Sequence, residues 1–244
     1  MNEIYANLFD RNRLTTVAPF SPLLGVTSRL FAVSHDGRFI FSGGHWDRSL
    51  RIYSLHKSKT INSIIGHTDI ITCLALDSTG FLLVTGSRDT TCIIWYLSLS
   101  HDHDTASSIH PERTLHGHTD EISCVCVSSE FDLVVSGSFD GTCNIHTIEQ
   151  GIYLRTLRPT DPLNHPVVNI RLSDERHILL QVENDQTHLY LYSINGDLIR
   201  MRKFEYNIVD MLISDQYIIL AVNHDQIVEK PAVASRVIIK DLFQ

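Results

Sequence analysis

Two sets of histidine, hydroxyl and aspartate side chains recur in this chain at the same spacing. The members of the two sets lie 51 positions apart and are His67, Thr85 and Asp89, then His118, Ser136 and Asp140. An aspartate, a histidine and a hydroxyl can act as a nucleophilic triad, in which the histidine takes the hydroxyl proton. A catalytic triad occurs once and lines a cleft, whereas this set is repeated. We therefore expect a structural role for both sets and predict no catalytic residue.

A second group of side chains could bind a metal ion. The run HDHD at residues 101–104 combines imidazole and carboxylate groups, which are ligands for zinc, and the chain holds 14 histidines. This run lies in a long stretch between Trp95 and His118 that we interpret as a hairpin loop. Flexible ligands rarely form a catalytic centre. We predict no metal and no cofactor, and a metal-dependent hydrolase is the alternative hypothesis.

The cysteines follow the same spacing. Cys73 lies 51 residues before Cys124, and Cys92 lies 51 residues before Cys143, each among apolar or β-branched neighbours. An odd total of five cysteines and the absence of a CxxC motif argue against a disulfide framework or a zinc site. We expect these thiols to pack in the core as small hydrophobic side chains.

These side chains belong to two long segments with one pattern. Residues 66–95 read GHTDIITCLALDSTGFLLVTGSRDTTCIIW, and residues 117–146 read GHTDEISCVCVSSEFDLVVSGSFDGTCNIH. Each contains three runs rich in apolar and β-branched residues, and a fourth such run precedes the next Gly-His. A shorter copy at residues 44–53, GHWDRSLRIY, has Asp47 at the turn, and a weaker copy has Asp185 there. The pattern predicts a repeated unit of four strands.

Composition limits the classes of protein that fit. The chain has 244 residues, of which 43% are hydrophobic and 20% charged, as is typical of a folded globular protein. Its net charge of −8 argues against nucleic-acid binding, because phosphate recognition needs clustered Lys and Arg. No apolar run reaches the roughly 18 residues that span a bilayer, and the start lacks a secretory signal. We expect a cytoplasmic protein without direct membrane insertion.

The repeat has the features of a WD-repeat β-propeller blade, namely a period of about 40–45 residues, four strands, a Gly-His and a strand that ends in Trp. We therefore expect an all-β fold with four to five recognisable four-stranded blades in an incomplete or degenerate propeller. The predicted parts are an N-terminal segment at 1–28, which is a closing strand or part of a preceding blade, and blades at about 29–58, 59–98, 112–150, 151–195 and 196–244.

The polar residues of the best blade are similar to the hydrogen-bonded tetrad of WD repeats. In that family the turn aspartate accepts from the histidine, and a hydroxyl links the histidine to the indole N–H. His67, Thr85, Asp89 and Trp95 match these positions, with Ser87 as the alternative hydroxyl. The next blade has His146 where the tryptophan belongs. The resemblance therefore implies a complete tetrad in one blade and a shortened one in the next.

The blades resemble one group of propellers, the C-terminal WD-repeat region of BEACH-domain proteins of the neurobeachin group. The segments that carry this likeness are FAVSHDGRFIFSGGHWDRSLRIYS, GHTDIITCLALD, LLVTGSRDTTCIIWY, SGSFDGTCNIHTI and YLRTLRP. Shared unusual features are Trp46 before the turn aspartate and Tyr53 and His146 in the tryptophan position. The likeness covers about residues 29–160 and is looser to residue 244.

The resemblance implies a function as well as a fold. In that family the propeller follows a BEACH domain on a very large cytosolic scaffold that acts in vesicle trafficking and membrane-protein localisation. It implies a non-catalytic scaffold that binds protein partners through a propeller face, with a BEACH domain upstream in the parent chain. It also implies a cytoplasmic location, with peripheral attachment to vesicle or Golgi-type membranes through partners.

Three residues are candidates for partner binding. Trp46, Arg88 and Phe139 each come directly before a turn aspartate. Equivalent positions in successive blades recur along one rim of a propeller face, and tryptophan and arginine in particular are common anchors of protein interfaces. We predict that these three residues contact a partner, and the alternative is that each packs on its neighbouring blade.

Overall fold

The fold is given by a computed structural model, which describes residues 5–7, 14–16, 20–22, 24–25, 27–98, 108–159, 165–184, 186–213, 217–223 and 235–241. The HDHD run at 101–104 and Asp185 lie outside these residues. The described residues form antiparallel strands and one short 3₁₀ helix, η1 (Ser28–Leu30). The predicted all-β fold is confirmed.

Five sheets follow one another along the chain. The first contains β3 (Phe31–Val33), β4 (Phe39–Ser42), β5 (Ser49–Ser54) and β6 (Lys59–Ile65). The second contains β7 (Ile71–Leu76), β8 (Leu82–Ser87), β9 (Cys92–Ser98) and β10 (Ser108–Leu115). The third contains β11 (Ile122–Ser128), β12 (Leu133–Ser138), β13 (Cys143–Thr147) and β14 (Tyr153–Leu157).

The fourth sheet contains β15 (Val167–Leu172), β16 (His177–Glu183), β17 (Thr187–Ser193) and β18 (Leu198–Phe204). The fifth contains β19 (Asn207–Ile213), β20 (Tyr217–Asn223) and β21 (Ser235–Asp241). A separate two-stranded ribbon is made of β1 (Tyr5–Asn7) and β2 (Leu14–Thr16). Each sheet is therefore a meander of consecutive strands.

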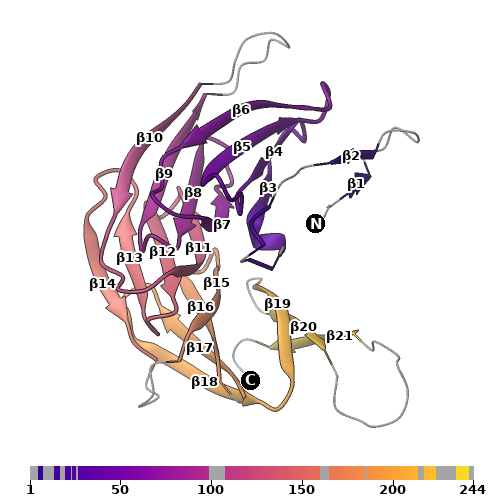
Figure 1. The fold of residues 1–244 in the computed structure, drawn as a ribbon. Helices are drawn as coiled ribbons and strands as arrows, with labels where there is room; N and C mark the ends of the chain where they lie inside the picture. The colour runs from indigo at the N-terminus through magenta and orange to yellow at the C-terminus, as the bar shows by residue number, and fades with distance from the viewer. Residues whose placement is uncertain are drawn as a thin grey trace.

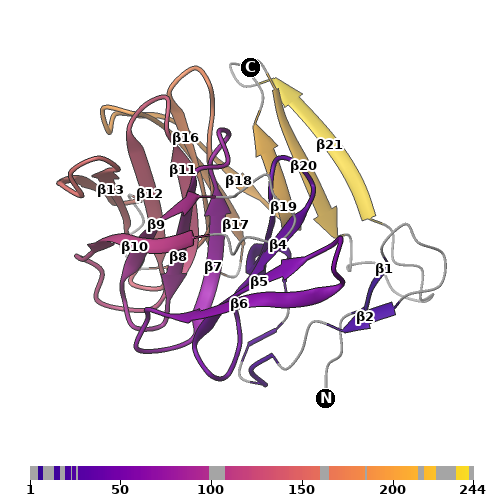
Figure 2. The same cartoon turned by 90° about the horizontal axis from the view of Figure 1, so that it is seen from above.

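The sheets are arranged around a central axis, as blades of a propeller (Figures 1 and 2). Strands β3, β7, β11, β15 and β19 lie innermost, and each of the first four contacts the inner strand of the next sheet. The five sheets follow an arc in Figure 1 that does not close into a ring. Among the described residues, no strand of the fifth sheet is hydrogen-bonded to the first sheet or to the ribbon.

The sheets are offset by one strand from the predicted blade ranges. Strand β6 falls in the predicted range 59–98 but pairs with β5 in the first sheet. In the same way, β14 lies in the range 151–195 but closes the third sheet. The reason is local: a short turn returns the chain antiparallel to the strand it has just left. The Gly-His then marks the crossing from one sheet to the next.

Apolar clusters fill the spaces between successive sheets. Phe41 and Ile52 of the first sheet pack with Leu83 and Trp95 of the second in one such cluster. Three further clusters join the second to the third, the third to the fourth and the fourth to the fifth sheet. All five cysteines are free, and burial raises the pKa of Cys92 to about 12. The thiols thus act as small apolar side chains in these clusters.

Three of the four joints between successive sheets have a glycine in the second strand or directly after it. A Cβ atom on Gly86 would lie 2.5 Å from Ile122 Cγ2 of the next sheet, and one on Gly137 would lie 2.7 Å from Val167 Cγ1. Gly43 meets Ile71 in the same way. A side chain at these positions would therefore overlap the first residue of the next inner strand and push the sheets apart.

A side-chain hydrogen bond accompanies two of these joints. The hydroxyl of Thr72 donates to the carbonyl of Ile122, and that of Ser123 donates to the carbonyl of Val167. The fourth sheet has Val168 at this position, which has no donor. There Gln181, which stands at the glycine position, donates from Nε2 to Ile208 O at 2.8 Å. In the fourth sheet, the hydrogen bond to the next sheet thus comes from Gln181 of the second strand.

Candidate functional site: the blade turns and their network

A buried network connects the turn of the second sheet to its core. Asp89 Oδ2 accepts a hydrogen bond from His67 Nδ1 at 3.0 Å, and His67 Nε2 lies 2.7 Å from Thr85 Oγ1. Trp95 Nε1 donates to the same hydroxyl at 2.9 Å. A neutral His67 with its proton on Nδ1 satisfies every group, because Thr85 can then donate to Nε2 and accept from Trp95. The structure thus brings all four predicted tetrad residues together.

The carboxylate of Asp89 also holds the chain around it. It accepts from Thr68 N at 2.8 Å, Thr91 N at 3.0 Å and Thr91 Oγ1 at 2.6 Å. Burial alone would raise the pKa of Asp89, but hydrogen bonds from His67 and Thr91 outweigh burial and hold the pKa well below its ordinary value. The carboxylate therefore connects the loop before β7 to the turn between β8 and β9.

The third sheet repeats this network in shortened form. His118 Nδ1 lies 2.9 Å from Asp140 Oδ2, and His118 Nε2 lies 2.9 Å from Ser136 Oγ. His146 occupies the position of the tryptophan, and its Nε2 bonds to His116 O at 3.1 Å instead. Burial lowers the pKa of His146 and so favours its neutral form. The network of the third sheet ends at Ser136.

The turn of the first sheet also holds a histidine next to a hydroxyl, but this histidine is not among the residues predicted from the sequence. Its histidine is His45, inside the turn itself, and His45 Nε2 lies 2.9 Å from Ser42 Oγ. Asp47 pairs instead with Arg51 at 2.8 Å and with Ser49, and these bonds outweigh burial and lower its pKa to about 2. The dipeptide Gly44-His45 in GGHWD could have indicated this histidine. It lies after the second strand of the sheet, whereas the Gly-His of the other copies precedes the sheet.

The three candidate partner-binding residues lie at equivalent places in successive turns. Trp46 is 64% exposed and Phe139 is 42% exposed. Arg88 is held across the joint, because its Nε lies 2.8 Å from Glu121 Oε2 just before β11. Backbone bonds fix both of the later turns, from Arg88 N to Ile70 O and from Phe139 N to Glu121 O. We call the surface formed by Trp46, Arg88 and Phe139 the blade-turn rim.

Metal binding was the other chemical possibility. Within the part of the chain that the structure describes, no group of three or more His, Cys, Asp or Glu side chains is arranged to hold a metal ion. Residues 101–104, on which the metal hypothesis rested, fall outside that part. A search of the described residues also found no helix long and apolar enough to cross a membrane.

Four-stranded sheets around an axis, joined at glycine positions and braced by an Asp-His-hydroxyl network, define a WD-repeat β-propeller region. The chain belongs to the neurobeachin β-propeller family, because residues 17–241 match the family described as "Neurobeachin beta propeller domain". The resemblance inferred from the blade residues is confirmed.

Similar proteins agree with this family. BEACH domain-containing protein B of Arabidopsis thaliana is 35% identical over 172 residues, which are 65% of this chain and 6% of that protein. A putative neurobeachin homolog of Caenorhabditis elegans is 32% identical over 184 residues, which are 71% of this chain and 7% of that protein. The chain thus spans only 6–7% of the length of these two relatives.

Solved structures share the fold. A chain in the crystal structure of the mitotic checkpoint complex superposes with a TM-score of 0.70 at 19% sequence identity. The match covers 91% of this chain and 65% of that chain. At this level of identity the similarity concerns the propeller fold alone.

Proposed function

We propose that this chain is a non-catalytic protein-interaction scaffold that binds partners through the blade-turn rim. The observation that carries this proposal is the exposure of Trp46 and Phe139, at 64% and 42%, on turns that buried networks hold in place. Binding residues are often found on loops that a rigid scaffold positions. Large aromatic side chains presented in this way are suited to anchor a protein interface.

The buried network supports a structural role over a catalytic one. The hydroxyl of Thr85 is fully buried, and it is used by both Trp95 and His67. A nucleophile must reach its substrate, whereas this hydroxyl has no exposed face. The alternative, a metal-dependent hydrolase, would be favoured if purified protein contained stoichiometric zinc.

The family suggests where the scaffold acts. Its relatives are named BEACH domain-containing protein and neurobeachin homolog. We infer a parent chain with a BEACH domain upstream, a cytoplasmic location, and attachment to vesicle or Golgi-type membranes through partners. In this proposal the chain contributes to vesicle trafficking and membrane-protein localisation by holding a partner at the rim.

Replacing both rim aromatics tests the proposal. In a pull-down from cytosol or vesicle extracts, the Trp46→Ala/Phe139→Ala variant is expected to lose the bands that the wild type captures. Each anchor should contribute about 2 kcal/mol or more to binding. The matched control is Tyr96→Ala/Tyr217→Ala, which removes two aromatics of similar exposure, 48% and 46%, away from the rim. Circular dichroism must show that both variants are folded.

Two results would contradict a rim site. One is an unchanged set of bands with a folded Trp46→Ala/Phe139→Ala variant, which would move the binding surface elsewhere. The other is an unfolded rim variant beside a folded control, which would make these side chains part of the packing between sheets. Arg88→Ala is measured separately, because it also breaks the ion pair with Glu121.

A further inference from the structure

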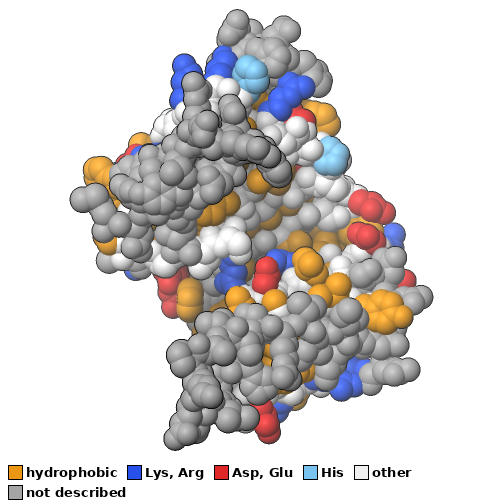
Figure 3. Space-filling view, turned by 90° about the vertical axis from the view of Figure 1, so that its right-hand side faces the viewer, with side chains coloured by type: hydrophobic (Ala, Val, Ile, Leu, Met, Phe, Trp, Pro, Cys, Tyr) orange, Lys and Arg blue, Asp and Glu red, His pale blue; other side chains and the backbone are white. Residues whose placement is uncertain are grey.

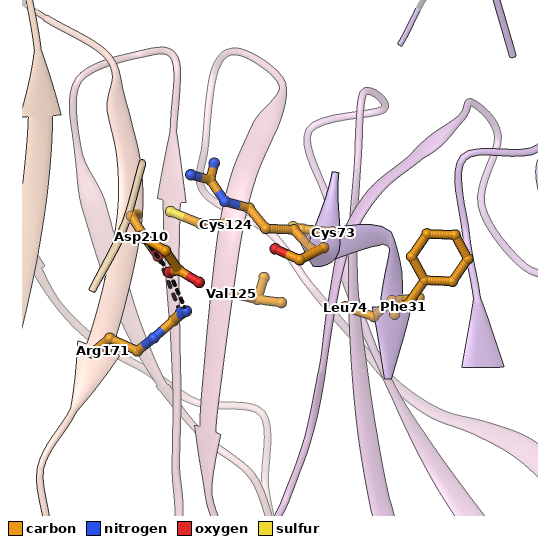
Figure 4. A pocket seen from close by; sticks show the side chains of 10 residues that line it. Phe31, Cys73, Leu74, Cys124, Val125, Arg171 and Asp210 are labelled. Atoms are coloured by element: carbon orange, nitrogen blue, oxygen red, sulfur yellow. Dashed lines mark hydrogen bonds and ion pairs between the residues drawn. The ribbon is translucent and has the colours of Figure 1, made fainter. Parts of the chain in front are cut away.

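A small cavity lies between the inner strands near the axis of the propeller. Its volume is about 230 Å³, and residues of η1, β3, β7, β11, β15 and β19 line it. Figure 4 shows Cys73, Cys124, Arg171 and Asp210 around it. Pockets for drug-sized ligands have volumes of about 300–1,000 Å³, so this cavity suits a single chemical group. The open side of the arc is hollowed at its centre, where basic and acidic side chains lie together (Figure 3).

The wall of the cavity changes from apolar to polar along the arc. In each sheet, one residue of the inner strand pairs with the residue at the glycine position of the second strand. This inner-strand residue is Cys73 in the second sheet and Cys124 in the third. The same register position is Asn169 in the fourth sheet and Asp210 in the fifth. Two thiols thus face one side of the cavity, and an amide and a carboxylate line the other.

Most hydrogen-bonding groups of Arg171 are already used inside the wall. Its Nε donates to Met211 O at 2.9 Å, and its Nη1 donates to Asn169 Oδ1 and Ile170 O, each at 3.0 Å. Its Nη2 donates to Asp210 Oδ1 at 2.8 Å. The pair of Arg171 and Asp210 is therefore a fixed, neutral part of the cavity (Figure 4).

Arg29 is the second guanidinium group that lines the cavity, and it is half-buried. Among the described residues it makes no hydrogen bond or ion pair. Burial raises the pKa of Cys124 to about 11, and the positive charges of Arg29 and Arg171 act against this rise, so both guanidinium groups lie near that thiol. With Arg171 neutralised by Asp210, the cavity carries one uncompensated positive charge.

We propose that this cavity binds one carboxylate, supplied by an acidic side chain or the C-terminus of a partner protein, with Arg29 as the anchoring residue. A half-buried guanidinium without a counter-charge is costly to desolvate, and its planar fork matches a carboxylate. A single negative charge balances the cavity. This goes beyond the blade-turn rim, since it assigns a second contact at the axis to a group of defined chemistry.

A titration with sodium acetate, followed by amide NMR of the whole chain, tests the proposal without a partner. The expected shifts centre on the amides of Cys73, Cys124 and Asn169. Arg29→Gln is expected to weaken acetate binding at least about tenfold, since a charged hydrogen-bonded pair is lost. Arg158→Gln removes the same charge from an exposed position and should leave the binding unchanged.

A second variant changes the cavity in the opposite sense. Asp210→Asn removes the only carboxylate that lines the cavity among the described residues, so acetate should bind more tightly. Acetate binding that neither Arg29→Gln nor Asp210→Asn alters would overturn the proposal. Inorganic phosphate that binds more tightly than acetate would also overturn it, in favour of a phosphate site. The rim variant Trp46→Ala/Phe139→Ala should bind acetate normally, which separates this test from that of the rim.

Discussion

Replacing Trp95 with alanine is expected to lower the free energy of unfolding by about 3–5 kcal/mol, the usual cost of removing a buried tryptophan. The side chain is fully buried between the first and second sheets, and it donates the hydrogen bond that completes the network through Thr85. The indole packs directly against Gly66, where a Cβ atom would lie 2.6 Å from Trp95 Cη2. Alanine would leave both a cavity and an unpaired hydroxyl lone pair.

The adjacent residue provides the control for Trp95. Tyr96 lies on the same strand but is 48% exposed, so Tyr96→Ala should cost no more than about 1 kcal/mol. Urea unfolding followed by far-ultraviolet circular dichroism measures both, because tryptophan fluorescence would change with the substitution itself. Equal shifts of the two midpoints would mean that Trp95 is not the central packing residue of this joint.

Replacing Asp89 with alanine is expected to lower the free energy of unfolding by about 2–4 kcal/mol, because it leaves His67 without its partner in a buried network. The backbone N–H groups of Thr68 and Thr91 lose their acceptor as well. Asp174→Ala, at an exposed turn position, should stay within about 0.5 kcal/mol of the wild type. Thermal melts of the two variants at neutral pH make the comparison.

The effect of Asp89 should also depend on pH. Its pKa is lower in the folded protein than in the unfolded chain, where it is about 3.9. The stabilisation is therefore complete above about pH 5, roughly one unit above the unfolded pKa, and declines as the pH falls further, toward the folded pKa. The difference between the wild type and Asp89→Ala should narrow over this acidic range. A difference that stays constant down to pH 2 would mean that the carboxylate is not held in its charged form.

The strands and the network of the second sheet could be predicted because local pattern and residue type agree there. Asp89 lies in the turn after an apolar strand, and Trp95 lies in the next strand, β9, at the distance that the WD repeat requires. The offset between blade ranges and sheets could not be predicted in this way. A strand before a Gly-His can pair with the strand that precedes it in the sequence or with the strand that follows it. The short turn before β6 or β14 makes each pair with the preceding strand.

The residues that were missed depend on contacts between distant parts of the chain. Gln181 replaces a joint glycine in a weaker copy of the repeat, and its bond to Ile208 crosses to another sheet. The axial cavity brings Arg29 near Arg171 and Asp210, which are far apart in the sequence. The sequence pattern of one sheet cannot predict this cavity, because each sheet contributes only one or two of the residues that line it.

The fifth sheet, at the open end of the arc, lacks the contacts that join the earlier sheets to one another. In the fifth sheet the joint position after Ile208 is Val209, which is 60% exposed, and Leu212 on the same strand is 58% exposed. The equivalent Thr72 and Ser123 each donate to a following sheet. Val209 has no side-chain donor, and Ala221, which stands at the glycine position of this sheet, has none either, unlike Gln181 in the fourth sheet. Among the described residues, the fifth sheet therefore makes no such bond to a following sheet.

Hydrogen exchange of the chain with and without a captured partner tests most directly whether the blade-turn rim is the interaction surface. Amides of the turns at 44–48 and 139–141, which contain Trp46 and Phe139, are expected to exchange more slowly in the complex. The outer strands β14 and β18 should exchange at the same rate in both samples. Protection confined to those outer strands, with the two turns unchanged, would contradict a rim site.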